Sequence, residues 1–331
     1  MACLIGLCGL LGVGPAAAND STAVLSTGGL VLTHSDGVEM RSEDLFISTQ
    51  AVRVKYRFWN TTTHEVMAVV AFPMPDITVE GEDDNMAIPT EDPRNILGFS
   101  TWVDGRAVAA QVEQKVLKDG VDRTALLRSM GVPLAPHLPS TGRVMDRLPA
   151  AAKQTLLKLN LAATEAYDAG RGWEKHIAPR WTLKTTYYWR QAFPAGREIV
   201  VEHHYKPSVG GTVESQIEID SLHVSPSYRA YLARYCIDPD LIATVKRVKT
   251  TSADGVAYSE AWIDYVLKTG GNWKSPIGSF RLVVDKGAAD NLISFCGQGV
   301  TKIGPTQFEM RKTDFRPTSD LAILILNRHP K

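Results

Sequence analysis

Hydrophobic and polar residues alternate over several stretches of the chain, most regularly after residues 51 and 181. From Val52 to Trp59, the even positions carry Val, Val, Tyr and Phe, and the odd positions carry Arg, Lys, Arg and Trp. From Trp181 to Arg190, the odd positions carry Trp, Leu, Thr, Tyr and Trp. Because successive side chains of a strand point to opposite faces, this period of two predicts half-buried β-strands in both places.

Other segments favour strands for different reasons. The run 65–72 is apolar on both faces and ends at Pro73, which is typical of a central strand. Segments 99–103 and 106–112 flank Asp104-Gly105, a pair that suits a type I′ hairpin turn because both central residues need positive φ. Further strands are expected at 198–205, 212–219, 261–267, 280–284, 306–311 and 321–326.

Between residues 116 and 178 the apolar positions follow a helical period instead. One helix is expected over 119–130, where Asp119 can cap the start and Gly131 follows the end. A second helix is expected from Pro149, and a proline-rich link at 133–139 separates the two. A short helix is also expected at 228–235. The pattern therefore predicts a helical hairpin inserted between β segments.

Together these elements predict a mainly β protein, with two β-sandwich-like domains and an inserted helical hairpin. The expected divisions are 19–115 for the N-terminal β-sandwich, 116–178 for the helical hairpin insertion and 179–331 for the C-terminal β-rich domain. The length of the chain suits two domains of ordinary size.

The first eighteen residues have the pattern of a secretory signal peptide. An apolar run from Ala2 to Val13 is followed by small residues that end at Ala18, which favours cleavage after Ala18. Neither this run nor any later one approaches the roughly 18 apolar residues of a membrane span. Cys8 follows Leu7 rather than a small residue, which disfavours lipid attachment. We therefore expect a cleaved, soluble protein in the periplasm or outside the cell.

Export determines how the four cysteines are interpreted. Cleavage after Ala18 removes Cys3 and Cys8, so Cys236 and Cys296 remain as one pair in an oxidising compartment. We predict a disulfide between them, which would stabilise the fold by roughly 4 kcal/mol in the chain-entropy model. A redox role would need a C-x-x-C or another activated thiol, and this wide spacing offers neither.

The charge balance excludes several classes of partner and chemistry. Lys plus Arg number 36 and Asp plus Glu also number 36, so the chain has no net field to hold nucleic acid or an anionic membrane. The motifs G-x-S-x-G, H-E-x-x-H, P-loop and G-x-G-x-x-G are absent from the sequence. Serine-hydrolase, zinc-protease and nucleotide chemistry therefore lack support, and no cofactor is expected.

His203 and His204 are the most prominent candidates for chemistry. Because they are neighbours on a predicted strand, their side chains point to opposite faces and cannot easily bind one metal ion. His203 shares its face with apolar residues, which favours a partly buried structural histidine. The alternative is proton transfer or metal ligation together with Asp264 or Glu202.

Two other groups of residues have alternative interpretations. The acidic segment 80–92 offers oxygen ligands for calcium, but it lacks D-x-D-x-D-G spacing, so a solvated loop is the simpler interpretation. Aromatic residues between 173 and 193 would suit stacking on a sugar, but most share a strand face with Leu183, as in a sandwich core. Tyr188 and Trp59 lie on the faces with Lys and Arg, so they are better candidates for exposed contacts.

Several stretches along nearly the whole chain match the pattern of a known family. They are 42–45, 52–60 and 71–76 in the first half, and 189–196, 203–207 and 269–273 in the second half. Together they resemble an uncharacterised secreted bacterial family known as domain of unknown function 4424. The resemblance implies export and two β-rich regions, and it implies no activity for any residue.

A second resemblance covers residues 50–115 only. A strand, an Asn turn, a second strand, Phe-Pro-x-Pro and the Asp104-Gly105 hairpin follow one another there. This order is similar to that of the vault and inter-alpha-trypsin inhibitor β-sandwich domain, which implies a protein-interaction module. The D-x-S-x-S metal motif of the von Willebrand A domain that commonly follows it is absent from the sequence.

These observations favour an exported, non-enzymatic interaction or structural protein of the bacterial cell envelope. Its partner would be a protein or an envelope component, engaged through edge strands or the helical hairpin. The alternative is a periplasmic enzyme or carbohydrate-binding protein with a site around His203 and His204. That alternative requires these groups to converge in one pocket.

Overall fold

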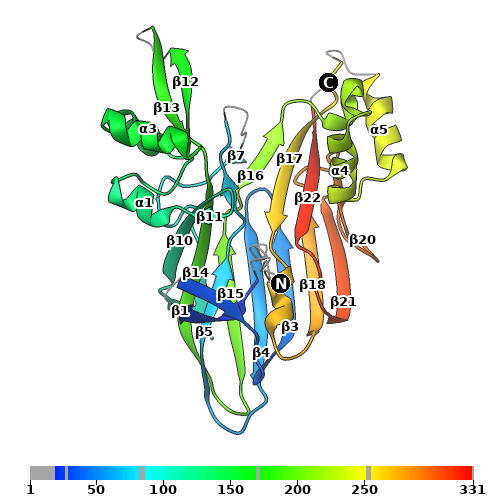
Figure 1. The fold of residues 1–331 in the computed structure, drawn as a ribbon. Helices are drawn as coiled ribbons and strands as arrows, with labels where there is room; N and C mark the ends of the chain where they lie inside the picture. The colour runs from blue at the N-terminus through cyan, green and yellow to red at the C-terminus, as the bar shows by residue number, and fades with distance from the viewer. Residues whose placement is uncertain (1–18, 27–28, 82–85, 169–171, 251–254, 330–331) are drawn as a thin grey trace, which may run out of the picture.

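The computed structural model describes residues 19–26, 29–81, 86–168, 172–250 and 255–329. The predicted signal peptide, residues 1–18, lies outside these ranges. Strands dominate the described chain and form four sheets (Figure 1). The predicted mainly β class is therefore confirmed. No described helix is long and apolar enough to cross a membrane.

The largest sheet contains strands from both halves of the sequence. Its order is β20-β21-β18-β3-β4-β15-β8-β9. β3 and β18 are parallel, and the other neighbours are antiparallel. The strands span β3 (Val38–Ile47), β4 (Val52–Asn60), β8 (Ser100–Val103), β9 (Arg106–Val108), β15 (Glu198–Tyr205), β18 (Ile277–Asp285), β20 (Thr301–Lys302) and β21 (Gln307–Phe315).

Two smaller sheets accompany the large one. The first has the order β11-β10-β14-β5-β1-β2, and β6 also pairs with β14. It is built from β1 (Ser21–Ser26), β2 (Gly29–Thr33), β5 (Val66–Pro73), β6 (Ile77–Thr78), β10 (Gln111–Lys118), β11 (Val121–Asp122) and β14 (Thr182–Phe193). The second has the order β19-β22-β17-β16-β7, with β7 (Met86–Ala87), β16 (Val209–Thr212), β17 (Tyr258–Tyr265), β19 (Leu292–Phe295) and β22 (Leu321–Arg328).

One apolar core joins the three sheets. Phe58 of the large sheet, Phe72 of the first small sheet and Ile323 of the second are all fully buried in it. The pairs β4–β15 and β3–β18 also link segments 19–115 and 179–331 within one sheet. The division of these segments into two folding units stays a prediction, and the shared core makes each segment depend on the other.

Two helices cover the second small sheet. They are α4 (Pro226–Tyr235) and α5 (Pro239–Lys249), and α4 agrees with the predicted helix at 228–235. Their tyrosines and Val245 pack with Leu324 and Leu326 of β22. The predicted disulfide between Cys236 and Cys296 is present, with the Cα atoms 5.1 Å apart. It joins the end of α4 to the residue after β19.

One predicted strand, 212–219, is wrong over most of its length. β16 ends at Thr212, and a 3-10 turn, η1 (Gln216–Glu218), follows. The Ser215 hydroxyl accepts a hydrogen bond from the Ile217 N–H, and the Glu218 carboxylate accepts one from the Ala257 N–H. These local bonds compete with strand pairing, because Ser at the start of a helical turn satisfies its free N–H groups.

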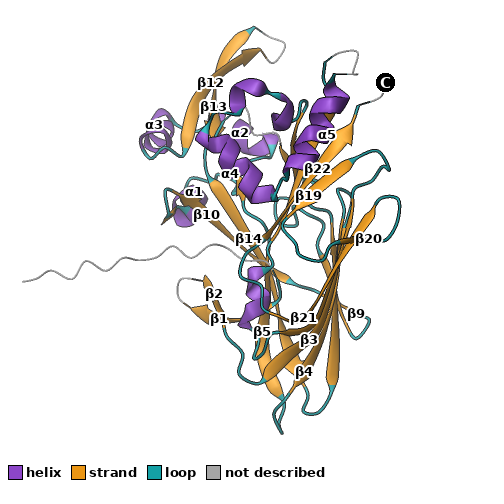
Figure 2. Cartoon of the chain, turned by 90° about the vertical axis from the view of Figure 1, so that its right-hand side faces the viewer, coloured by secondary structure: helices purple, strands orange, loops and turns teal. Residues whose placement is uncertain are grey.

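Residues 124–179, which we call the arm, lie between β10 and β14 in the sequence. The arm contains α1 (Thr124–Ser129), α2 (Pro139–Asp146), α3 (Ala150–Lys158) and the hairpin of β12 (Ala162–Asp168) and β13 (Trp173–Pro179). It projects from one end of the sheets, as does the α4–α5 pair (Figures 1 and 2). Its own small core includes Leu127, Met145, Leu156 and Trp181.

The arm differs in detail from the predicted helical hairpin. The first helix begins at Thr124 instead of residue 119, because Asp119 and Gly120 both have positive φ and form the turn between β10 and β11. A third helix, α2, begins at Pro139, the last residue of the predicted proline-rich link. The strands β12 and β13 were not predicted.

Candidate functional site

The structure separates the residues selected from the sequence. His203 is fully buried, and its Nε2 lies 3.0 Å from Asp20 Oδ1, among the rings of Phe72, Phe99 and Trp189. His204 lies on the other face of β15, with its ring against Trp102. Partial burial lowers the pKa of His204. The two imidazoles therefore do not face one pocket.

The carboxylates proposed as their partners are already ion paired. Glu202 shares a surface hollow of about 280 Å³ with His204, but its carboxylate lies 2.6 Å from Lys55 Nζ. Asp264 belongs to β17 in another sheet, and the Arg234 guanidinium donates hydrogen bonds to both of its oxygens at 2.8 Å. A site built from these residues stays a prediction: Glu202 and His204 share one hollow, Asp264 lines another, and His203 lines neither.

The two candidates for exposed contacts are only partly exposed, and part of the acidic segment lies outside the described ranges. Trp59 is half-buried beneath the Arg41 guanidinium, 3.9 Å from the ring centroid, and Tyr188 is half-buried on β14. Within the acidic segment 80–92, residues 82–85 lie outside the described ranges. Asp92 accepts hydrogen bonds from the N–H groups of Arg94 and Asn95, which lower the pKa of its carboxyl group.

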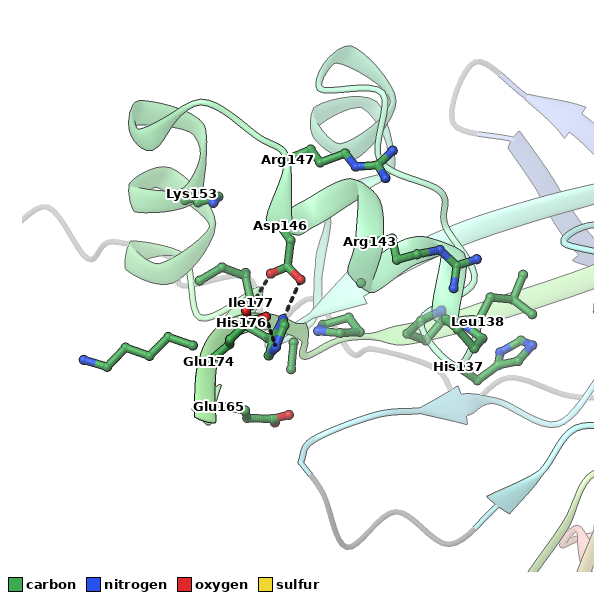
Figure 3. A pocket seen from close by; sticks show the side chains of 16 residues that line it. His137, Leu138, Arg143, Asp146, Arg147, Lys153, Glu165, Glu174, His176 and Ile177 are labelled. Atoms are coloured by element: carbon green, nitrogen blue, oxygen red, sulfur yellow. Dashed lines mark hydrogen bonds and ion pairs between the residues drawn. The ribbon is translucent and has the colours of Figure 1, made fainter. Parts of the chain in front are cut away.

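The described residues form a cleft of about 710 Å³ on the arm (Figure 3). The loop before α2, α2 itself and the inner side of the β12–β13 hairpin line it, and Lys153 of α3 borders it. Arg143 and His137 lie toward one end in the close view, Lys153 lies toward the other, and Asp146 lies between them. We call it the arm cleft.

Asp146 connects the two walls of the arm cleft. Its Oδ2 lies 2.8 Å from His176 Nδ1, and its Oδ1 accepts a hydrogen bond from the Ile177 N–H at 2.8 Å. On the other side of the imidazole, Glu174 Oε2 lies 4.0 Å from His176 Nε2. Both Asp146 oxygens are thus occupied by β13, and α2 is held against the hairpin.

Four cationic side chains surround this pair. Arg143, Arg147, Lys153 and Lys175 all line the arm cleft, and none makes an ion pair or side-chain hydrogen bond with another residue in the described ranges. α2 also has no acidic residue in its first turn, and its N-cap residue, Leu138, forms no side-chain cap. Free N–H groups and the helix dipole leave partial positive charge at such an end. The same lining also holds three carboxylates, those of Asp146, Glu165 and Glu174, so four cations against three anions leave the arm cleft a formal charge of +1 with its histidines neutral.

The polar side chains in the described lining of the arm cleft are those of Arg, Lys, His, Asp and Glu. The described lining residues include no Ser, Thr, Tyr or Cys, so no hydroxyl or thiol nucleophile is present there. Asp146 and His176 resemble an acid–base pair, and His176 Nε2 is buried, 4.0 Å from Glu174 Oε2. No group of three metal-ligating side chains occurs in the described ranges.

The sequence contained one signal for this site. Arg143 and Arg147 are four residues apart, which places them on one face of a helix. Pro139 at the first helical position was the indication that a helix starts there. The prolines at 133 and 136 favoured a link instead, so the helix was missed.

Comparisons with known proteins identify a family. The family model described as "Domain of unknown function (DUF4424)" matches residues 18–324. Among solved structures, a "putative nutrient binding protein" from Legionella pneumophila is similar, with 15% sequence identity, 94% of this chain and 72% of that chain covered, and a TM-score of 0.43. No curated protein matches.

Proposed function

Because the chain belongs to the DUF4424 family, whose description names no activity, we propose its function from the geometry of the arm cleft. It is an exported, non-enzymatic binding protein of the cell envelope that holds a small solute bearing carboxylate or phosphate oxygens. The proposal retains the prediction that the protein is not an enzyme, and it assigns ligand binding to the arm.

One observation carries the proposal: a single cleft of about 710 Å³ is lined by four cations without an ion-pair partner among the described residues, against three carboxylates. Ligand pockets typically measure roughly 300–1,000 Å³, so the size suits a small molecule. Arg143 and Arg147 can form two-pronged hydrogen bonds to a carboxylate or phosphate, whereas Lys153 and Lys175 contribute point charges. Asp146 would not repel such a ligand strongly, since both of its oxygens accept from β13.

Two further features support export. The residues before Asn19 have the signal-peptide pattern described above. The disulfide between Cys236 and Cys296 is of the kind that persists in oxidising compartments such as the periplasm. A binding protein in that compartment would meet solutes that have crossed the outer boundary of the cell.

Isothermal titration calorimetry tests the proposed ligand class. The chain starting at Asn19 is titrated with citrate, inorganic phosphate and glucose in low salt. We expect an anion to bind and glucose not to bind. Affinity should fall as KCl is added, because salt screens exposed charges over about 10 Å at 0.1 M.

Two lysines on α3 provide a matched comparison. Lys153→Gln removes a cation that lines the arm cleft, and Lys158→Gln removes one from the same helix outside it. We expect the double variant Arg143→Gln/Lys153→Gln to bind at least about tenfold more weakly, since one charged hydrogen bond contributes roughly 1.5–3 kcal/mol. Lys158→Gln should bind like the native chain. Equal affinity in all three proteins, or binding of glucose alone, would refute the proposal.

A further inference from the structure

The first described residues are buried in the core instead of lying on the surface. Asn19 and Asp20 both have 0% exposure. The Asn19 N–H donates to Thr269 Oγ1 at 2.7 Å, and Trp273 Nε1 donates to the Asp20 carbonyl at 2.7 Å. The chain is therefore anchored between the sheets from residue 19 onward.

Two buried carboxylates lie beside this anchored segment. Asn19 Nδ2 donates to Glu43 Oε2 at 2.9 Å, and His203 Nε2 lies 3.0 Å from Asp20 Oδ1. The second oxygen of each carboxylate, Glu43 Oε1 and Asp20 Oδ2, is buried and has no donor with hydrogen-bond geometry. The side chains of Glu43 and Asp20 are 1% and 0% exposed.

The described protein supplies little positive charge to these two groups. No Lys or Arg in the described ranges forms an ion pair or hydrogen bond with Asp20 or Glu43, and of the two carboxylates His203 pairs only with Asp20. Burial, with the nearby charge of Asp20, raises the pKa of Glu43 to about 8 against opposing hydrogen bonds from Asn19 and Tyr265, and burial also raises the pKa of Asp20. Asp20 has His203 as its partner, but an ionised Glu43 would be buried without a positive charge beside it, which is costly, so the ionised cluster lacks one cation.

We propose that the missing cation is the α-ammonium group of Asn19, created when a leader peptidase cuts the chain after Ala18. Hydrolysis of this peptide bond consumes one water molecule. The leaving peptide gains a carboxylate at Ala18, and the nitrogen of Asn19 becomes a protonated amine. Signal-peptide removal then completes the charge balance of the core.

The number of hydrogen-bond donors fits this assignment. As a peptide nitrogen, Asn19 N has one hydrogen, and Thr269 Oγ1 accepts it. As an ammonium group it has three hydrogens, and the two additional ones equal in number the two oxygens of this cluster that lack a donor, Asp20 Oδ2 and Glu43 Oε1. Charge-assisted bonds of this kind are about twice as strong as neutral ones.

Comparing two versions of the N-terminus tests the inference. The mature chain begins at Asn19, and the extended chain keeps Ala18, which moves the ammonium away from the cluster. Thermal unfolding of both chains is followed between pH 4.5 and 8. At pH 7.5 we expect the mature chain to melt roughly 5 °C above the extended chain.

The pH dependence follows from the sign of the Glu43 shift. In the extended chain, folded Glu43 keeps its proton up to about pH 8, whereas the unfolded chain releases it near 4.5. The folded state thus binds more protons than the unfolded state over this window, so stability falls as pH rises from 4.5 to 8. In the mature chain the ammonium favours the ionised carboxylate, and this fall should be smaller.

Two variants on β3 show whether Glu43 is responsible. Glu43→Gln should remove the difference between mature and extended chains, whereas Glu39→Gln, on the same strand next to Arg41, should leave it unchanged. If Glu43→Gln does not fold, a second experiment replaces this variant. The native chain is labelled with an amine-reactive reagent, and the labelled sites are mapped by mass spectrometry. The α-amine should react at least about tenfold more slowly in the folded chain than in urea.

Three results would overturn the inference. The first is equal melting temperatures and pH profiles for the mature and extended chains. The second is an α-amine that reacts as fast in the folded chain as in the unfolded chain. The third is an exported protein whose mass places its first residue elsewhere than Asn19. None of these results depends on whether the arm cleft binds an anion.

Discussion

At the scale of single residues, the most unusual feature is the group of polar side chains inside an aromatic core. His203 and Asp20 form a pair with both side chains fully buried. Tyr56 donates to the Asn19 side-chain oxygen, and its hydroxyl lies 3.2 Å from that of Tyr265. Buried polar groups are tolerated when they bond one another, and they then favour one arrangement of the surrounding strands.

Neighbouring histidines provide a test of this pair. We expect His203→Leu to lower the free energy of unfolding by about 3–5 kcal/mol, because it leaves Asp20 buried without its partner. His204→Leu, on the outer face of the same strand, should change it by less than about 1 kcal/mol. Urea unfolding followed by tryptophan fluorescence measures both. Similar losses in the two variants would argue against a special role for the Asp20–His203 pair.

At the scale of elements, local chemistry explains both the successes and the errors of prediction. The β8–β9 turn has positive φ at Asp104 and Gly105, as a type I′ hairpin requires. α5 has Asp238 as its N-cap, with Pro239 following, and this helix was nevertheless missed. α4 and α5 are joined by three residues, and the disulfide attaches the end of α4 to the end of β19, the strand that pairs with β22.

Removing this disulfide should loosen the covering of the second small sheet. We expect Cys236→Ser/Cys296→Ser to lower the free energy of unfolding by about 4 kcal/mol in the chain-entropy model. Denaturant unfolding measures the loss, and dithiothreitol should destabilise the native chain but not the variant. Two free thiols in the exported protein, detected by mass spectrometry without reductant, would contradict this prediction.

At the scale of the whole molecule, the protein consists of a β body with one shared core and an arm with a smaller core of its own. The arm leaves the body after β10 and returns at β14, and these strands are paired with Leu117 opposite Thr182. Its two ends therefore lie next to each other. This connection makes the arm separable from the body, although Val116 and Trp181 contribute to the core of the arm.

Deleting the arm tests both its independence and its proposed role. Replacing residues 119–180 by Asn-Gly extends the β10–β14 pairing into a two-residue hairpin. We expect the body to keep its β-sheet circular dichroism and to melt a few degrees lower, because Val116 and Trp181 lose their cover. Anion binding should be abolished. Retained binding by the deletion variant would locate the ligand on the body instead.

The sequence by itself determined the features that depend on neighbouring residues. Alternation predicted β4 and β14, Asp104-Gly105 predicted the β8–β9 turn, and counting cysteines predicted the one bond between distant residues. Such features can be predicted from the local periodicity of a strand, from the φ preference of a turn, or from the presence of only two cysteines in the mature chain.

Only the tertiary structure decided which strands pair and where charge gathers. The parallel β3–β18 pair, the contact of Asn19 with Thr269 and the pairing of Asp20 with His203 join residues about 180 to 250 positions apart. The four cations of the arm cleft likewise come from α2, α3 and β13. A local pattern states which face of an element is buried, but it does not identify the segment that covers that face. For this reason the arm cleft and the buried acidic cluster became visible only in the folded chain.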